Sequence, residues 1–143
     1  MSRMYSVSGF GQVEPAGLQG WVDESTILVQ RTIRSGQSVH YIGNVAILGD
    51  VNPGAEVTAT GDVIVMGALR GVVHAGAEGD EKAIVMAFHL QPTQLRIAGY
   101  ITRPPDNEAI DALYPEMAHI KGGVVTIEYF QPTAERYGEK HRA

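Results

Sequence analysis

Glycines divide the middle of the chain into short segments, and their regular spacing restricts the fold more than any other feature. The glycines of one segment return in the next after 18, 18 and 17 residues: Gly43, Gly49 and Gly54 recur as Gly61, Gly67 and Gly71. Runs rich in β-branched side chains lie between them, too short for helices and typical of strands. A period of about 18 residues, cut into pieces of about six, predicts an all-β solenoid with three short parallel strands per coil.

The turns between these segments repeat as well. Four dipeptides align at this period, the last after an insertion around residues 76–80: Ile33-Arg34, Val51-Asn52, Leu69-Arg70 and Leu90-Gln91. The first position is always aliphatic and the second always polar, so the same corner is expected in every coil. Four repeats predict about four coils. Inward side chains are expected to form apolar ladders that include Val45, Ile47, Val63, Val65 and Ile84.

Glycine accounts for 17 of the 143 residues, well above its usual share of about 7%. Each coil has to turn sharply three times, and glycine adopts the positive φ angles of such corners without steric cost. Stacked corners also bring backbones close together, where a Cβ atom would intrude. We therefore interpret six glycines as structural corners: Gly43, Gly49, Gly54, Gly61, Gly67 and Gly76.

The two ends of the chain lack this period. Residues 1–25 are rich in Gly, Ser, Pro and Gln and are interpreted as a flexible lead-in or linker, ahead of a β-helix domain at residues 26–130. Within that domain, residues 106–114 predict a short amphipathic helix ended by Pro115, and residues 123–130 predict a final strand. Together they would cap the open end of the stack. Residues 131–143 form a polar tail.

Composition excludes several classes of protein. The chain has no cysteine, which removes disulfide scaffolds, thiolate metal sites and cysteine nucleophiles. A formal net charge of −5 argues against a dedicated nucleic-acid binder, and no apolar run approaches the ~20 residues that span a bilayer. The five histidines share no spacing that would make them converge on a metal. We therefore expect neither a metal, a cofactor nor enzymatic activity.

The corner Arg34-Ser35-Gly36-Gln37 is the most informative candidate site. The 18-residue column places Arg34 and Arg70 at one corner with Asn52 between them, which sets their backbones roughly 10 Å apart. Two guanidinium groups on one edge of an acidic protein suit a partner surface that carries carboxylates. Candidates for a dimer face are two apolar runs, residues 84–88 and 124–127.

These residues resemble a known family, the C-terminal domain of the septum site-determining protein MinC. The resemblance covers about residues 26–130 and rests on motifs in the same order: Arg34-Ser-Gly-Gln37, Gly54-Ala-Glu56, the Arg70-Gly71 corner, the Gly76-Ala-Glu-Gly-Asp80 insertion and Ile97-Ala-Gly-Tyr100. It implies a short right-handed β-helix that forms a homodimer through an apolar face.

The resemblance also implies a function in cell division. Members bind the ATPase MinD through the corner matched here by Arg34, Ser35, Gly36 and Gln37, with Arg70 and Gly71 beside it. MinD brings such cytoplasmic proteins to the inner face of the membrane, where they antagonise FtsZ polymers and keep the septum from wrong sites. Some members co-assemble with MinD into filaments. Members usually carry an N-terminal domain that contacts FtsZ. We expect this sequence, with about 25 residues in that place, to be a fragment or a shortened relative.

Two other functions remain open from the residues themselves. Short β-helix proteins can stack end to end, so the chain could be a structural subunit of a cytoskeletal filament. A hexapeptide-repeat transferase or a carbonic anhydrase would show a strict six-residue aliphatic repeat and converging histidines. The sequence shows neither.

Overall fold

Short strands, none longer than seven residues, form the described part of the chain, which comprises residues 25–104 and 114–130 of a computed structural model. No helix is present in these two ranges. In chain order the strands are β1 (Thr26–Val29), β2 (Ser38–Tyr41), β3 (Asn44–Ile47), β4 (Glu56–Ala59), β5 (Val63–Leu69), β6 (Val72–Ala75), β7 (Val85–Leu90), β8 (Gln94–Ile97), β9 (Tyr100–Thr102), β10 (Glu116–Lys121) and β11 (Val124–Tyr129).

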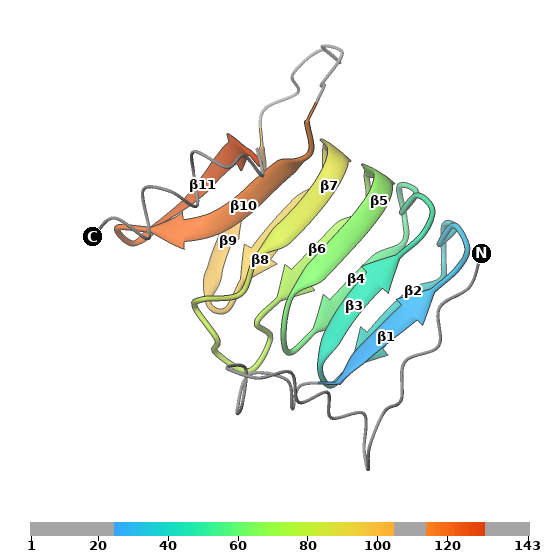
Figure 1. The fold of residues 1–143 in the computed structure, drawn as a ribbon, viewed down its shortest axis with the longest axis horizontal. Helices are drawn as coiled ribbons and strands as arrows, with labels where there is room; N and C mark the ends of the chain where they lie inside the picture. The colour runs from blue at the N-terminus through green and yellow to red at the C-terminus, as the bar shows by residue number, and fades with distance from the viewer. Residues whose placement is uncertain (1–24, 105–113, 131–143) are drawn as a thin grey trace, which may run out of the picture.

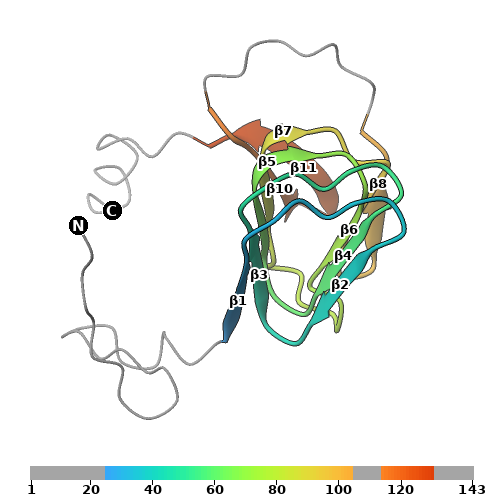
Figure 2. The same ribbon diagram turned by 90° about the vertical axis from the view of Figure 1, so that its right-hand side faces the viewer.

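The chain alternates between two sheets, which we call the first and the second sheet. The first sheet has the order β1-β3-β5-β7-β10-β11, and the second has the order β2-β4-β6-β8-β9. Each strand from β1 to β6 pairs in parallel with the strand one coil further along the chain, so that β7 and β8 are the last parallel strands. The result is a coiled stack, seen from the side in Figure 1 and along its axis in Figure 2. The predicted β-solenoid is confirmed.

The third side of each coil is shorter than predicted. It holds single paired residues, Ile33 with Val51 and Val51 with Leu69, and Leu69 in turn pairs with Leu90. In Figure 2 this side closes the three-sided outline without a strand in the first two coils. In the first coil, β1 ends at Val29 and the next corner begins directly after Ile33, so little extended backbone fits between two bends.

The core consists of inward side chains stacked in register from coil to coil. Val45 pairs with Val63 and Val63 with Val85, and all three are at most 1% exposed. The prediction that Ile84 continues this ladder was wrong, because Ile84 is only half-buried and Val85 takes the inward position. The insertion after β6 lengthens this coil to 22 residues, from Val63 to Val85, and so changes which residue points inward.

The corner glycines are required for two different reasons. Three have a positive φ, the conformation that side chains disfavour: Gly43 (+134°), Gly54 (+87°) and Gly76 (+57°). At the other three, a Cβ atom would collide with the neighbouring coil, namely with Arg31 at Gly49, with Asn44 at Gly61 and with Asp50 at Gly67. Both reasons were expected from the sequence.

The C-terminal end of the stack abandons the parallel arrangement. The predicted final strand is confirmed as β11, but the sequence did not predict β10, which pairs antiparallel with both β7 and β11. In the second sheet, β9 pairs antiparallel with β8. Apart from Tyr114, the predicted helix at 106–114 lies outside the described residues, as do the lead-in up to residue 24 and the tail from residue 131.

Candidate functional site

The arginine corner is a tight turn that leads from the third side of the first coil into β2. The N–H of Gln37 donates to the carbonyl of Arg34 at 2.9 Å, and Gly36 has the positive φ (+84°) found at the third position of a type II turn. Ile33, 1% exposed, anchors the entry to the turn in the core. The four turn residues are all exposed. The corner therefore presents its side chains from a fixed backbone, as recognition sites require.

The predicted column of polar residues is confirmed. The backbone N–H of Asn52 donates to Ile33 O at 2.9 Å, and that of Arg70 donates to Val51 O at 2.8 Å. These bonds place Arg34, Asn52 and Arg70 one above the other at the same corner. Two strand spacings, roughly 10 Å, separate the two arginine backbones.

Gly54 and Gly71, in the two coils that follow, allow the stacked corners to pack closely together. Gly54 lies directly against Ser35, so that a Cβ atom at Gly54 would collide with the Ser35 hydroxyl. Gly71 is buried, and a Cβ atom there would meet the carbonyl oxygens of Ala55 and, at 2.8 Å, of Asn52. Gly71 is thus a packing residue within the site, whereas Arg70 beside it is exposed.

The guanidinium groups of the corner are available for a partner. Within the residues that the structure describes, neither Arg34 nor Arg70 forms an ion pair, and both side chains are exposed. An arginine held on a fixed edge can donate two hydrogen bonds to a carboxylate or phosphate group of a partner. The corner is therefore suited to bind a negatively charged or strongly polar partner.

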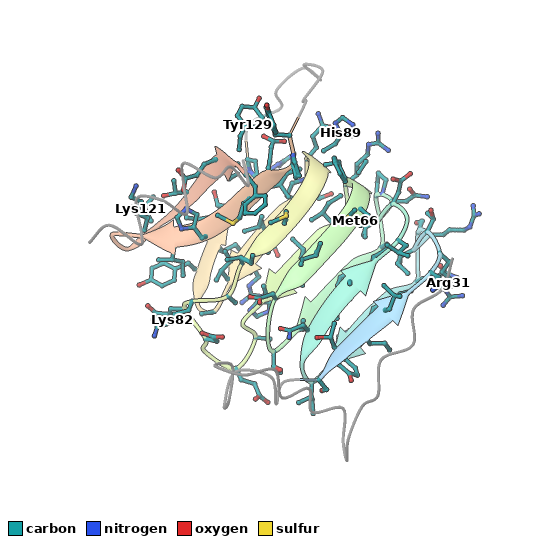
Figure 3. All side chains as sticks on the ribbon, viewed as in Figure 1. Arg31, Met66, Lys82, His89, Lys121 and Tyr129 are labelled. Atoms are coloured by element: carbon teal, nitrogen blue, oxygen red, sulfur yellow. The ribbon has the colours of Figure 1, made fainter. Side chains whose placement is uncertain are left out.

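The outer face of the first sheet has the opposite character. An outward ladder crosses it in register, in which all the members are apolar: Leu28, Ala46, Ile64, Met86 and Met117. Beside it, Leu48 is 45% exposed and Met66 is 50% exposed. Met66 lies on the face turned toward the viewer in Figure 3. Such a contiguous apolar face is typical of a protein interface.

The outer face of the second sheet is polar by comparison. Its register places His40, Thr58, His74 and Arg96 in one outward column. The Nε2 of His74 forms a hydrogen bond with the carbonyl of Ala98 at 2.9 Å. The two large faces of the same coil therefore differ in chemistry, and the apolar one is the candidate for a dimer.

The histidines and acidic residues of residues 25–104 and 114–130 are not gathered into a metal site. No group of three or more His, Asp or Glu side chains there could hold a metal ion. His119 and Glu128 form an exposed pair on β10 and β11, and no third ligand joins them. No helix within the described ranges has the length and hydropathy to cross a membrane.

Short stacked coils, a polar corner and an apolar outer sheet define a β-solenoid with two chemically different surfaces. The family model for the septum formation inhibitor MinC, C-terminal domain, matches residues 27–130. The chain belongs to this family. The resemblance drawn from the corner motifs is confirmed.

Named relatives agree with this assignment. The probable septum site-determining protein MinC of Heliobacterium modesticaldum is 59% identical over 117 residues, which cover 82% of this chain and 40% of the relative. Its counterpart in Acetivibrio thermocellus is 62% identical over 102 residues, covering 71% of this chain and 45% of the relative. The chain thus spans less than half the length of either relative.

A solved structure shares the fold. A chain of the MinC:MinD cell division protein complex of Aquifex aeolicus superposes with a TM-score of 0.70 at 37% identity, covering 83% of this chain and 97% of that chain.

Proposed function

We propose that this chain is a non-enzymatic binding module in the selection of the division site, and that it docks on a MinD-type ATPase through Arg34–Gln37, with Arg70 and Gly71 beside them. The observation that carries the proposal is the exposed corner, where two guanidinium groups without an ion-pair partner among the described residues are stacked on a rigid column. Membership of the MinC family supports it, as does the likeness to a chain of a MinC:MinD complex.

The test is binding to the ATP-loaded ATPase. We expect Arg34→Ala to weaken binding by at least about tenfold, because arginines at the centre of an interface are frequent hot spots. The matched control is Arg103→Ala, which removes an exposed arginine outside the corner and should leave binding unchanged. Undiminished binding of Arg34→Ala would overturn the assignment of the site.

The same module is proposed to form a homodimer through the outer face of the first sheet. Met66 and its apolar neighbours on that face support this choice, since the outer face of the second sheet is polar. We expect Met66→Glu to shift the protein from dimer to monomer in sedimentation equilibrium. Thr58→Glu, on the outer face of the second sheet, should leave the dimer intact. A dimer that survives Met66→Glu and dissociates on Thr58→Glu would show that the interface lies on the second sheet, and the proposed dimer face would be wrong.

We further propose that the module is cytoplasmic and reaches the membrane through the ATPase, where it contributes to the inhibition of FtsZ assembly. Co-sedimentation with anionic phospholipid vesicles tests this recruitment. The chain should sediment only when MinD and ATP are both present, and Arg34→Ala should stay in the supernatant. Sedimentation without MinD would contradict it.

The alternative is a structural subunit that self-assembles into filaments. Among the described residues, no strand covers the outer edges of β1 and β2, which favours this function because parallel edges accept further strands. The antiparallel strands β9, β10 and β11 at the other end interrupt the parallel stacking and place this function second. Electron microscopy of the isolated protein distinguishes the two, since filaments without any partner would favour the alternative.

A further inference from the structure

One backbone group of the arginine corner differs from its counterparts in the other coils. In the later coils, the N–H at this column position donates to a carbonyl of the preceding coil: Asn52 to Ile33 at 2.9 Å, Arg70 to Val51 at 2.8 Å and Gln91 to Leu69 at 2.9 Å. Arg34 belongs to the first described coil, and no described residue supplies the equivalent carbonyl. Its N–H donates instead to Oε1 of the Gln37 side chain, at 2.8 Å.

The direction of this N–H follows from its neighbour. The N–H of Ile33 donates to Asp50 O of the second coil at 2.8 Å. Successive N–H groups of an extended chain point in opposite directions, so the N–H of Arg34 points away from the second coil. Without Gln37 it would have no protein acceptor among the described residues.

The second coil shows when a side-chain acceptor is needed for the N–H at this column position. There the turn from Asn52 to Ala55 is closed in the same way, with the Ala55 N–H donating to Asn52 O at 3.0 Å. Ala55 stands where the first coil has Gln37, and it carries no acceptor. None is required, because the N–H of Asn52 is already bonded to Ile33.

We propose that Gln37 is a positioning residue of the partner-binding corner: its side-chain carbonyl accepts the N–H that the later corners bond to the preceding coil, and it thereby fixes the backbone that carries the Arg34 guanidinium. Its backbone is also tied on both sides, by the N–H to Arg34 O at 2.9 Å and by the carbonyl, which accepts the Glu56 N–H at 3.1 Å. The inference deepens the proposed binding of the ATPase, and it assigns contact to Arg34 and geometry to Gln37.

The first test needs no partner. Gln37→Met keeps the length of the side chain and removes the acceptor, whereas Gln37→Glu keeps the acceptor oxygen. By amide hydrogen exchange in the free protein, we expect the Arg34 N–H to exchange about fivefold faster in Gln37→Met, and Gln37→Glu to restore slow exchange. The control Gln30→Met makes the same chemical change at an exposed position outside the corner. Unchanged Arg34 exchange in Gln37→Met overturns the proposal.

The second test separates positioning from contact. Gln37→Met should lower the affinity for the ATP-loaded ATPase about fivefold in the parent chain and produce no further loss in the Arg34→Ala background. An equal loss in both backgrounds would show that Gln37 contacts the partner itself and would overturn the positioning role. If the parent chain does not bind the ATPase, the proposed function fails, and the exchange experiment still decides the role of Gln37.

Discussion

Gly36 and Gly54 occupy the same position in successive turns, and substituting each by alanine separates backbone conformation from packing. Their φ angles are nearly equal, +84° and +87°. A Cβ atom at Gly36 would meet nothing within 4 Å, whereas at Gly54 it would collide with the Ser35 hydroxyl and lie 3.1 Å from the Ser35 Cβ. The two substitutions therefore share one cost and differ in the other.

The shared cost is that of placing an L-residue at positive φ, about 1 kcal/mol. Gly36→Ala should lose little more than this. At Gly54 the Ser35 hydroxyl can rotate away, but the Ser35 Cβ moves only with the turn, which adds about 1 kcal/mol of overpacking. We expect Gly54→Ala to lose about 2 kcal/mol of unfolding free energy, twice the loss at Gly36. Gly36→Asn should lose less than Gly36→Ala, because asparagine tolerates this conformation.

Urea unfolding followed by circular dichroism measures these differences, provided that the m-values agree. Gly54→Ala should also weaken binding of the ATPase, because the added methyl group in the second coil would displace Ser35 of the arginine corner. A larger loss of stability at Gly36 than at Gly54 would refute the reasoning, because only Gly54 has a neighbour to collide with.

Substitutions at three further positions test the fold by the same unfolding measurement. Leu69→Ala should cost about 3 kcal/mol, since Leu69 is 0% exposed and bridges to Val51 on the third side; a loss below about 1 kcal/mol would mean that the site collapses around the cavity. Ala98→Gly should stabilise by up to about 1 kcal/mol because Ala98 has a φ of +53°, and a destabilised variant would contradict this. Asp50→Ala should cost about 1 kcal/mol through loss of the Oδ1 that accepts the Ala68 N–H at 2.8 Å. Asp50→Asn keeps that oxygen and should retain most of the stability.

The coil and its corner could be predicted because they repeat. Regular spacing of glycines fixed the length of a coil, and the alternation of aliphatic and polar residues identified the column that holds Arg34 and Arg70. Each coil places the same types of residue at the same positions, so four repeats give a clear pattern although each repeat alone is a weak indication. The insertion broke this rule: it lengthened one coil, and the inward position passed from Ile84 to Val85.

The dimer face could not be chosen from the sequence because strands of the first sheet are apolar on both sides. In β5, Val63 and Val65 point into the core, yet Ile64 between them and Met66 after them are also apolar. The alternation that normally separates core from surface is therefore missing. Only the register shows that Ile64 and Met86 share one outer ladder. The sequence did not predict β10 for a different reason, namely that this strand has no counterpart in the repeat.

Gln37 was assigned to the site by resemblance, but its hydrogen bond to the Arg34 N–H could not be predicted. A comparison of repeats shows only the features that the coils share, and this hydrogen bond is not one of them. For the corner of the first described coil, no described residue supplies the carbonyl that each later corner receives from the coil before it. Its N–H is satisfied instead by a side chain that the inner coils do not need. Gln37 therefore departs from the repeat, and it fixes the backbone of the corner that carries the Arg34 guanidinium.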